Sequence, residues 1–136
     1  MGRYRIFLVA ALFLLLPGAI SAFELGSKSF LDNPVPARML YPKGETASLQ
    51  GKSALEFQWS DPIPVNTGGF EFRLYKGYDS TEPNLITKEN LDRDAGSLSV
   101  GADKFENGQV YTWTLKRISD DGRKSDLVYN SFTVIK

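Results

Sequence analysis

Two residue types that carry much of protein chemistry are absent from this chain of 136 residues, which contains no histidine and no cysteine. Histidine is the side chain that most readily exchanges protons near neutral pH, and the cysteine thiolate acts as a nucleophile and as a zinc ligand. Ser-His-Asp catalysis, Cys-His catalysis and histidine-ligated metal sites are therefore excluded. Without cysteine there is also no disulfide bond and no lipid-modified cysteine.

Three weaker chemical patterns remain, and each lacks an essential part. Gly51-Lys52-Ser53 resembles the end of a phosphate-binding loop, but Thr46 replaces its first glycine and a strand is expected to follow instead of a helix. Asp92-Arg93-Asp94 resembles the start of a calcium loop whose later oxygen ligands are missing. No motif fixes two acids at the spacing that glycoside hydrolysis requires. We therefore expect no catalytic residue, no metal and no cofactor.

The composition is that of one folded domain, because 42% of the residues are hydrophobic and 12% are aromatic. The chain carries 16 basic and 16 acidic residues. Arg3 and Arg5 belong to a segment that we expect to be removed, and without them 14 basic and 16 acidic residues give a net charge of −2. Because the mature chain has no basic block, we expect no nucleic-acid partner and no membrane association after the signal is cleaved.

Residues 1–22 have the order of regions found in a secretory signal peptide, and we expect them to form a helix that precedes the fold. Two arginines come before an apolar run over residues 6–16, and Pro17-Gly18 then leads into small residues. Cleavage near Ser21-Ala22 would make the protein secreted or periplasmic. An uncleaved anchor is the alternative, but the run is shorter than the roughly 20 residues that span a membrane. Export without disulfide bonds favours a bacterial source.

The rest of the chain divides into an extended leader over residues 23–34 and a folded domain over residues 35–136. Asn33-Pro34-Val35-Pro36 fixes an extended backbone. Since proline cannot donate to a central ladder, we expect residues 37–41 to form an edge strand.

Four segments alternate between apolar and polar residues with period two, which is the pattern of strands with one buried face. These segments are residues 55–59, 70–74, 111–115 and 132–134. Turn residues separate them, and residues 84–88 and 97–100 fit weaker strands. Together with residues 37–41 this makes seven short strands, a number and spacing that predict an all-β, antiparallel, immunoglobulin-like β-sandwich.

The order of these segments resembles the fibronectin type III family over roughly residues 36–136. The run from Phe105 to Tyr111 matches hydrophobe-x-x-Gly-x-x-Tyr, with Gly108 at its centre. Trp59 ends the alternation Leu55-x-Phe57-x-Trp59 on the second strand, and Phe132-Thr133-Val134 matches the closing strand. The resemblance implies that the Tyr111 hydroxyl bonds back to the backbone of the preceding turn. Phe105 departs from the leucine usual in the family.

The inward phase of these strands predicts the structural core, and the outward phase predicts a candidate binding surface. The expected core residues are Trp59, Phe72, Phe105, Tyr111 and Trp113. In the family the third, sixth and seventh strands share a sheet, so its outer face would carry Glu71, Arg73, Tyr75, Thr112, Thr114 and Lys116, with Tyr78 in the turn that follows. Tyrosine and arginine are favourable anchors for a protein or a sugar. The alternatives are a solvated face with paired charges and strand addition at the edge of the last strand.

The missing catalytic side chains, the signal segment and the sandwich pattern favour a non-catalytic secreted binding or structural module. We expect it to mediate protein–protein or cell-envelope interactions. A carbohydrate-binding module and a small secreted hydrolase are the alternatives. The partner is an unidentified protein or polysaccharide, and self-association or assembly into a larger envelope complex stays open because the sandwich fold hosts many functions.

Overall fold

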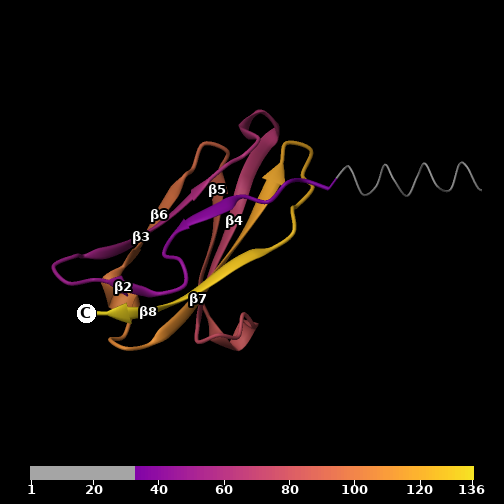
Figure 1. Cartoon of the computed structure of the whole chain (residues 1–136). Coiled ribbons are helices and arrows are strands. Elements are labelled where there is room, and N and C mark those ends of the chain that lie inside the picture. The colour runs from indigo at the N-terminus through magenta and orange to yellow at the C-terminus, as the bar shows by residue number, and fades with distance from the viewer. Residues whose placement is uncertain (1–32) are drawn as a thin grey trace, which may run out of the picture. The chain divides into compact units, whose positions relative to one another are not determined.

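The computed structural model describes residues 33–136 (Figure 1). The predicted signal peptide and nearly all of the predicted leader lie outside the described residues. Within residues 33–136 the helices are three short 3-10 turns, and none of them has the length and hydrophobicity to cross a bilayer.

Two β-sheets make up the domain, so the sequence prediction of an all-β sandwich is confirmed. One sheet has the strand order β1-β3-β6 and the other β2-β8-β7-β4-β5. The strands are β1 (Arg38–Tyr41), β2 (Thr46–Ser48), β3 (Ala54–Ser60), β4 (Thr67–Lys76), β5 (Leu85–Asp92), β6 (Ser97–Gly101), β7 (Val110–Ser119) and β8 (Val128–Ile135). As expected from the prolines before it, β1 is an edge strand.

The structure corrects the predicted strand number and direction, because residues 33–136 contain eight strands and β2 runs parallel to β8. Three residues are too few to show an alternation in the sequence, and Ala47 alone turns its side chain into the core from β2. Backbone bonds hold β2 in place, since the Thr133 N–H donates to the Glu45 carbonyl at 2.9 Å and the Leu49 N–H donates to the Ile135 carbonyl at 2.7 Å. The β8 edge over residues 133–135, which the alternative of strand addition would need to be open, is therefore covered by β2.

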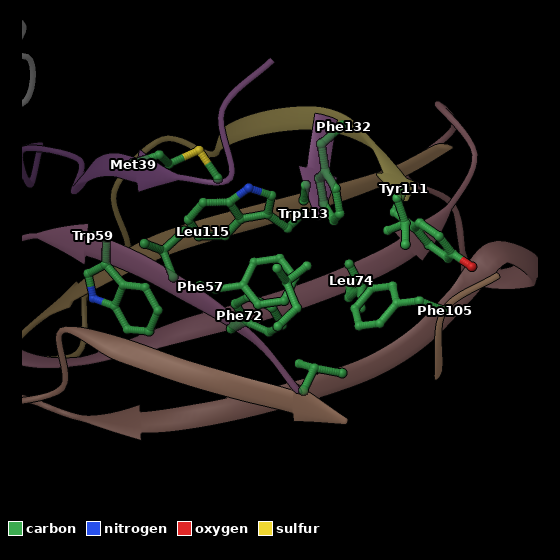
Figure 2. Close-up of a cluster of buried hydrophobic side chains, with 14 of the residues drawn as sticks. Met39, Phe57, Trp59, Phe72, Leu74, Phe105, Tyr111, Trp113, Leu115 and Phe132 are labelled. Carbon is green, nitrogen blue, oxygen red and sulfur yellow. The ribbon is translucent and has the colours of Figure 1, made fainter. Parts of the chain in front are cut away.

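The core is built around aromatic rings from both sheets, with Phe57 at its centre (Figure 2). The Phe57 ring meets Phe72, Trp113 and Phe132 edge to face, at centroid distances of 5.0, 5.2 and 5.8 Å. This is the geometry that aromatic quadrupoles favour. The expected core residues Trp59, Phe72, Phe105, Tyr111 and Trp113 are all at most 3% exposed. The Trp113 indole N–H also donates to the Pro42 carbonyl at 2.9 Å, which ties the chain between β1 and β2 to the core.

The turn that leads into β7 contains the backbone contact that the family resemblance implied. The Glu106 N–H donates to the Tyr111 hydroxyl at 2.7 Å. Phe105, in the place of the usual leucine, meets the Tyr111 ring edge to face at 5.0 Å. A buried tyrosine hydroxyl needs such a partner, so the corner both packs the ring and satisfies its polar end.

A β-bulge at Gly68 changes the alternation at the start of β4. On β7, Ser119 pairs with Thr67 and the next residue, Ile118, pairs with Gly69, which leaves Gly68 as the extra residue. An extra residue reverses the facing of everything before it. Thr67, which simple alternation would place on the outer face with Gly69, is therefore buried at 0% exposure.

We predict that Gly69→Ala will lower the free energy of unfolding by about 1–3 kcal/mol, the usual cost of forced overpacking. A Cβ at this position would lie 2.5 Å from the Leu91 carbonyl oxygen on β5, and backbone on a paired strand cannot yield easily. Chemical denaturation monitored by tryptophan fluorescence measures the change.

Gly96→Ala is the matched control. A Cβ there meets only the Trp59 carbonyl oxygen at 3.7 Å, an ordinary contact, so we expect a change within about 0.5 kcal/mol. Equal stability losses in the two variants would contradict the proposed role of the close approach between β4 and β5.

Candidate functional site

The outer face of the five-stranded sheet carries the residues that the sequence placed there. Arg73 on β4 lies opposite Thr114 on β7, and Thr114 lies opposite Tyr129 on β8. In the neighbouring row Glu71 lies opposite Lys116. Directly opposite residues in antiparallel strands share a face and touch, so pairing alone gathers these side chains into one surface.

Five of the expected residues line a groove of about 190 Å³ together with two residues that the sequence analysis missed. The groove is lined by Glu71, Arg73, Tyr75, Ser80, Thr114, Lys116 and Leu127. Ser80 comes from the segment between β4 and β5 and Leu127 from the segment between β7 and β8, and no alternation pattern marks either residue. We refer to this feature below as the outer groove.

The other two expected residues lie outside the outer groove. Thr112 is on the same face, but its hydroxyl is already used, since it bonds the Gly77 carbonyl at 2.8 Å and the Ser131 hydroxyl at 2.7 Å. Tyr78 follows Gly77 in the segment after β4 and is 73% exposed. Thr112 therefore fastens the β4 end, and Tyr78 projects from a turn.

The expectation of an openly exposed face was wrong for several of these side chains. Tyr75 is 4% exposed, Glu71 is 6% exposed, and Thr112 and Thr114 are each 1% exposed. Side chains from the flanking segments and long neighbours on adjacent strands cover them, as the hydrogen bond from Lys124 to Glu71 illustrates. Tyr75 thus forms part of the groove wall and is not available as a protruding anchor.

The charge of Glu71 is held by cations around it. The Lys124 ammonium donates to the Glu71 carboxylate at 3.4 Å, and the Arg73 guanidinium lies 3.7 Å from it. Burial acts to raise the pKa of Glu71, but the Lys124 hydrogen bond and the charges of Lys124, Arg73 and Lys116 outweigh it and leave the pKa below its ordinary value. Glu71 is therefore an ionised carboxylate at neutral pH.

Arg73 is bonded less completely than Glu71. Besides Glu71, its nearest carboxylate is that of Glu82, at 3.8 Å, and Glu82 has a side chain that is 76% exposed. The Arg73 Nε–H is buried and has no hydrogen-bond partner. The adjacent Tyr75 hydroxyl, together with Glu71 and Glu82, holds the pKa of Arg73 above its ordinary value against the opposing effect of burial. The guanidinium is permanently charged and keeps unused donors beside the groove.

Within residues 33–136, the tyrosines do not form a flat aromatic platform of the kind that binds sugars. Tyr75 is buried, Tyr78 lies in the segment after β4, and Tyr129 is 68% exposed on β8. Tyr41 lies half-buried on β1, in the other sheet. Among residues 33–136 there is also no group of three acidic side chains placed to hold a metal ion.

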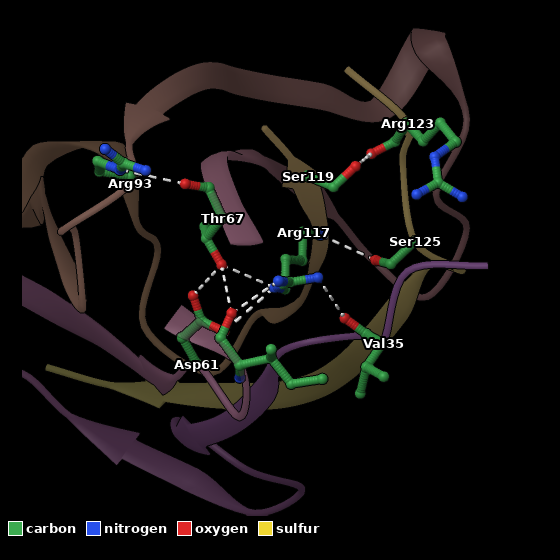
Figure 3. Close-up of polar contacts among 9 residues, drawn as sticks. Val35, Asp61, Thr67, Arg93, Arg117, Ser119, Arg123 and Ser125 are labelled. Carbon is green, nitrogen blue, oxygen red and sulfur yellow. Dashed lines mark hydrogen bonds and ion pairs between the residues drawn. The ribbon is translucent and has the colours of Figure 1, made fainter. Parts of the chain in front are cut away.

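A second polar cluster, which the sequence analysis missed, surrounds Arg117 at one end of the core (Figure 3). Arg117 is 2% exposed. Its Nε–H donates to Asp61 at 3.1 Å and to the Thr67 hydroxyl at 2.8 Å, and its NH2 group donates to the Ile63 carbonyl at 2.8 Å. Its NH1 group donates to the Val35 carbonyl at 3.4 Å. Each of its three nitrogens donates to a protein group and the side chain is buried, so Arg117 closes this end of the sandwich and does not face a ligand.

The two clusters therefore differ in what they can do. The Arg117 cluster is saturated by protein groups, as a structural ion pair must be. The outer groove combines cationic donors from Arg73 and Lys116 with the apolar side chain of Leu127, which is 44% exposed. Arginine is among the residue types enriched in binding hot spots.

Among solved structures, the chain is similar to one described as a computer-based redesign of a β-sandwich protein. The TM-score is 0.53 at 15% sequence identity, and the match covers 77% of this chain and 96% of that one. At this identity the likeness shows the β-sandwich fold alone. No protein-family model matches the chain. No curated protein matches it either.

We predict that Lys124→Met will raise the pKa of Glu71 towards its ordinary value of 4.5, because it removes the hydrogen bond and a charge that lower it. A carboxyl with a lowered pKa stabilises the fold above its unfolded-state value, and this contribution is lost as the pH falls through the folded-state pKa. In the variant, Glu71 should therefore contribute less stability above this value, and less stability should be lost as the pH falls. Carboxyl-detected NMR titration measures the pKa directly.

Lys52→Met is the control for that titration, because Lys52 is exposed in the turn before β3, outside the groove. It should leave the pKa of Glu71 unchanged. A Glu71 titration that is the same in Lys124→Met and in the unmodified protein would refute the assignment of Lys124 as the partner of Glu71.

We predict that Arg117→Met will lower the free energy of unfolding by about 3 kcal/mol or more, because it leaves the largely buried Asp61 carboxylate without its ion-pair partner. Urea denaturation gives the value, and a variant that is unfolded without denaturant falls in the expected range. Arg93→Met is the matched control, since exposed Arg93 contacts the same Thr67 by donating to its carbonyl at 3.2 Å. It should cost less than about 1 kcal/mol. Similar losses in both variants would rule out the closing role of Arg117.

Proposed function

We propose that this protein is a non-catalytic, secreted module of the fibronectin type III kind that binds a partner protein at the cell envelope through the outer groove. The family assignment is supported by the strand order of the sandwich and by the bond from the Glu106 N–H to the Tyr111 hydroxyl. The likeness to a redesigned β-sandwich protein supports the fold on which the assignment rests.

Secretion is supported by the sequence of residues 1–22. The two arginines, the apolar run and the small residues at Ser21-Ala22 have the order of a cleavable signal. A domain with no cysteine needs no disulfide to be stable after export, because its aromatic core is buried from both sheets. A bacterial periplasm or exterior is therefore the proposed location.

The observation that carries the binding role is the groove itself, where Arg73, Lys116 and Leu127 meet over a volume of about 190 Å³. Protein interfaces are enriched in arginine and aromatic residues, with apolar contact at their centre. A protein partner is favoured over a polysaccharide because Tyr41, Tyr75, Tyr78 and Tyr129 are scattered over both sheets and a turn. Self-association is one form that this protein partner can take.

We predict that a photo-crosslinking amino acid at Leu127 will capture a protein partner when the exported protein is expressed in its native cell. The side chain lines the groove and is 44% exposed, so a bound partner lies within reach of it. The expected product is an adduct of one defined mass, seen on a denaturing gel and identified by mass spectrometry.

Gln50 is the control position, because it is exposed in the turn between β2 and β3 and does not line the groove. The same adduct from Gln50 and Leu127 would show that the outer groove is not the binding surface. Adducts of heterogeneous mass that shrink with glycosidase would replace the protein partner with a polysaccharide.

A further inference from the structure

The outer groove contains an arginine that bonds the Tyr75 side chain but makes no hydrogen bond to a carboxylate. A guanidinium has five N–H donors in a planar fork. The two carboxylates nearest to the Arg73 guanidinium are those of Glu71, at 3.7 Å, and Glu82, at 3.8 Å. Both distances are too long for hydrogen bonds. The Nε–H of Arg73 is buried without a partner. The terminal NH1 and NH2 groups make only these long carboxylate contacts, and they are the donors that an acceptor entering the groove would meet.

The balance of charge in the groove favours an anion. Glu71 is the acidic residue that lines the groove, and Lys124 already bonds it at 3.4 Å. This leaves the charges of Arg73 and Lys116 facing the same space. Glu82 lies outside that lining and is mostly exposed, so its pairing with Arg73 is screened by water and contributes little.

The groove is sized and flanked for a side chain of a peptide. Its volume is about 190 Å³, and half-exposed Leu127 forms part of its wall. Tyr129 projects from β8 beside Thr114 and is 68% exposed. Apolar residues next to a cationic groove suit a carboxylate flanked by hydrophobic neighbours. Arginine recognises carboxylate with two parallel hydrogen bonds.

We propose that the outer groove recognises an acidic side chain in an exposed segment of a partner protein. Arg73 and Lys116 bind the carboxylate, and Leu127 and Tyr129 contact the apolar residues on either side of it. This inference rests on the proposed function and deepens it by naming the chemistry of the partner. Arg73 is the specificity-determining residue, since it supplies the bidentate donors.

An NMR titration of the whole domain tests the inference with two short peptides, acetyl-Leu-Glu-Leu-amide and acetyl-Leu-Gln-Leu-amide. The glutamate peptide should shift the Arg73 Nε–H resonance and the backbone amides of Thr114 and Lys116. The glutamine peptide should bind at least tenfold more weakly. Arg73→Gln and Lys116→Gln should each weaken binding of the glutamate peptide by about tenfold, the loss expected for one charge-assisted hydrogen bond.

Lys88→Gln is the matched control, because Lys88 lies opposite Arg73 on β5 but does not line the groove. This variant should bind the glutamate peptide as the unmodified domain does. Equal binding of the two peptides would overturn the inference. It would also be overturned if one of the two variants, Arg73→Gln or Lys116→Gln, bound the glutamate peptide as tightly as the unmodified domain does. Inorganic sulfate binding as tightly as the glutamate peptide would overturn it as well, because the groove would then be a general anion site.

The outcome separates this inference from the proposed function. If the Leu127 crosslink persists in Arg73→Gln and Lys116→Gln, the domain binds a partner by other contacts and the carboxylate inference fails. If the peptides are discriminated but Leu127 captures no protein in the cell, the groove has the inferred chemistry and the proposed function fails.

Discussion

The rest of the structure depends on one buried charge, that of Arg117. A charge removed from water must be paired and hydrogen-bonded, or it costs several kcal/mol. Here its partners come from Asp61, Thr67 and the carbonyls of Ile63 and Val35. Each of these groups has to be brought to the end of the core. This one requirement therefore fixes the segment between β3 and β4, the start of β4, and the residues that precede β1. The Gly68 bulge is part of it, because the bulge turns Thr67 inward.

The same residue also fixes the groove on the opposite face of the sheet. Since Arg117 points into the core, its neighbour Lys116 must point outward into the groove. The backbone of Arg117 holds the other wall, because its N–H donates to the Ser125 hydroxyl at 2.9 Å and its carbonyl accepts the Ser125 N–H at 2.8 Å. Ser125 lies between Lys124, which bonds Glu71, and the segment that carries Leu127. The core pairing and the outer groove are therefore mechanically linked through β7.

Alternation in the sequence was enough to predict the two-sheet fold and the facing of residues 55–59, 70–74, 111–115 and 132–134, because one buried face imposes period two. It failed at Thr67, which the Gly68 bulge turns inward. The same alternation, continued from Tyr111, Trp113 and Leu115, also predicts that Arg117 points inward. It was not assigned to the core because a charged residue is rarely buried. The remaining differences arise where period two carries no information. Strand β2 is too short to alternate, and the burial of Tyr75 depends on how the flanking segments fold over the sheet. Those segments contribute Ser80 and Leu127 without any local pattern.

The completeness of hydrogen bonding is what distinguishes the two important arginines, and sequence cannot reveal it. Arg117 has acceptors for all its nitrogens and is 2% exposed, so a ligand could bind it only by displacing groups that hold the fold together. Arg73 lies at a sheet position with two distant carboxylates and an unpartnered Nε–H. The terminal NH1 and NH2 groups of Arg73 make only these long carboxylate contacts. A ligand carboxylate at these groups would displace no bond that holds the fold together, which is why the less completely bonded arginine is the one suited to the proposed recognition.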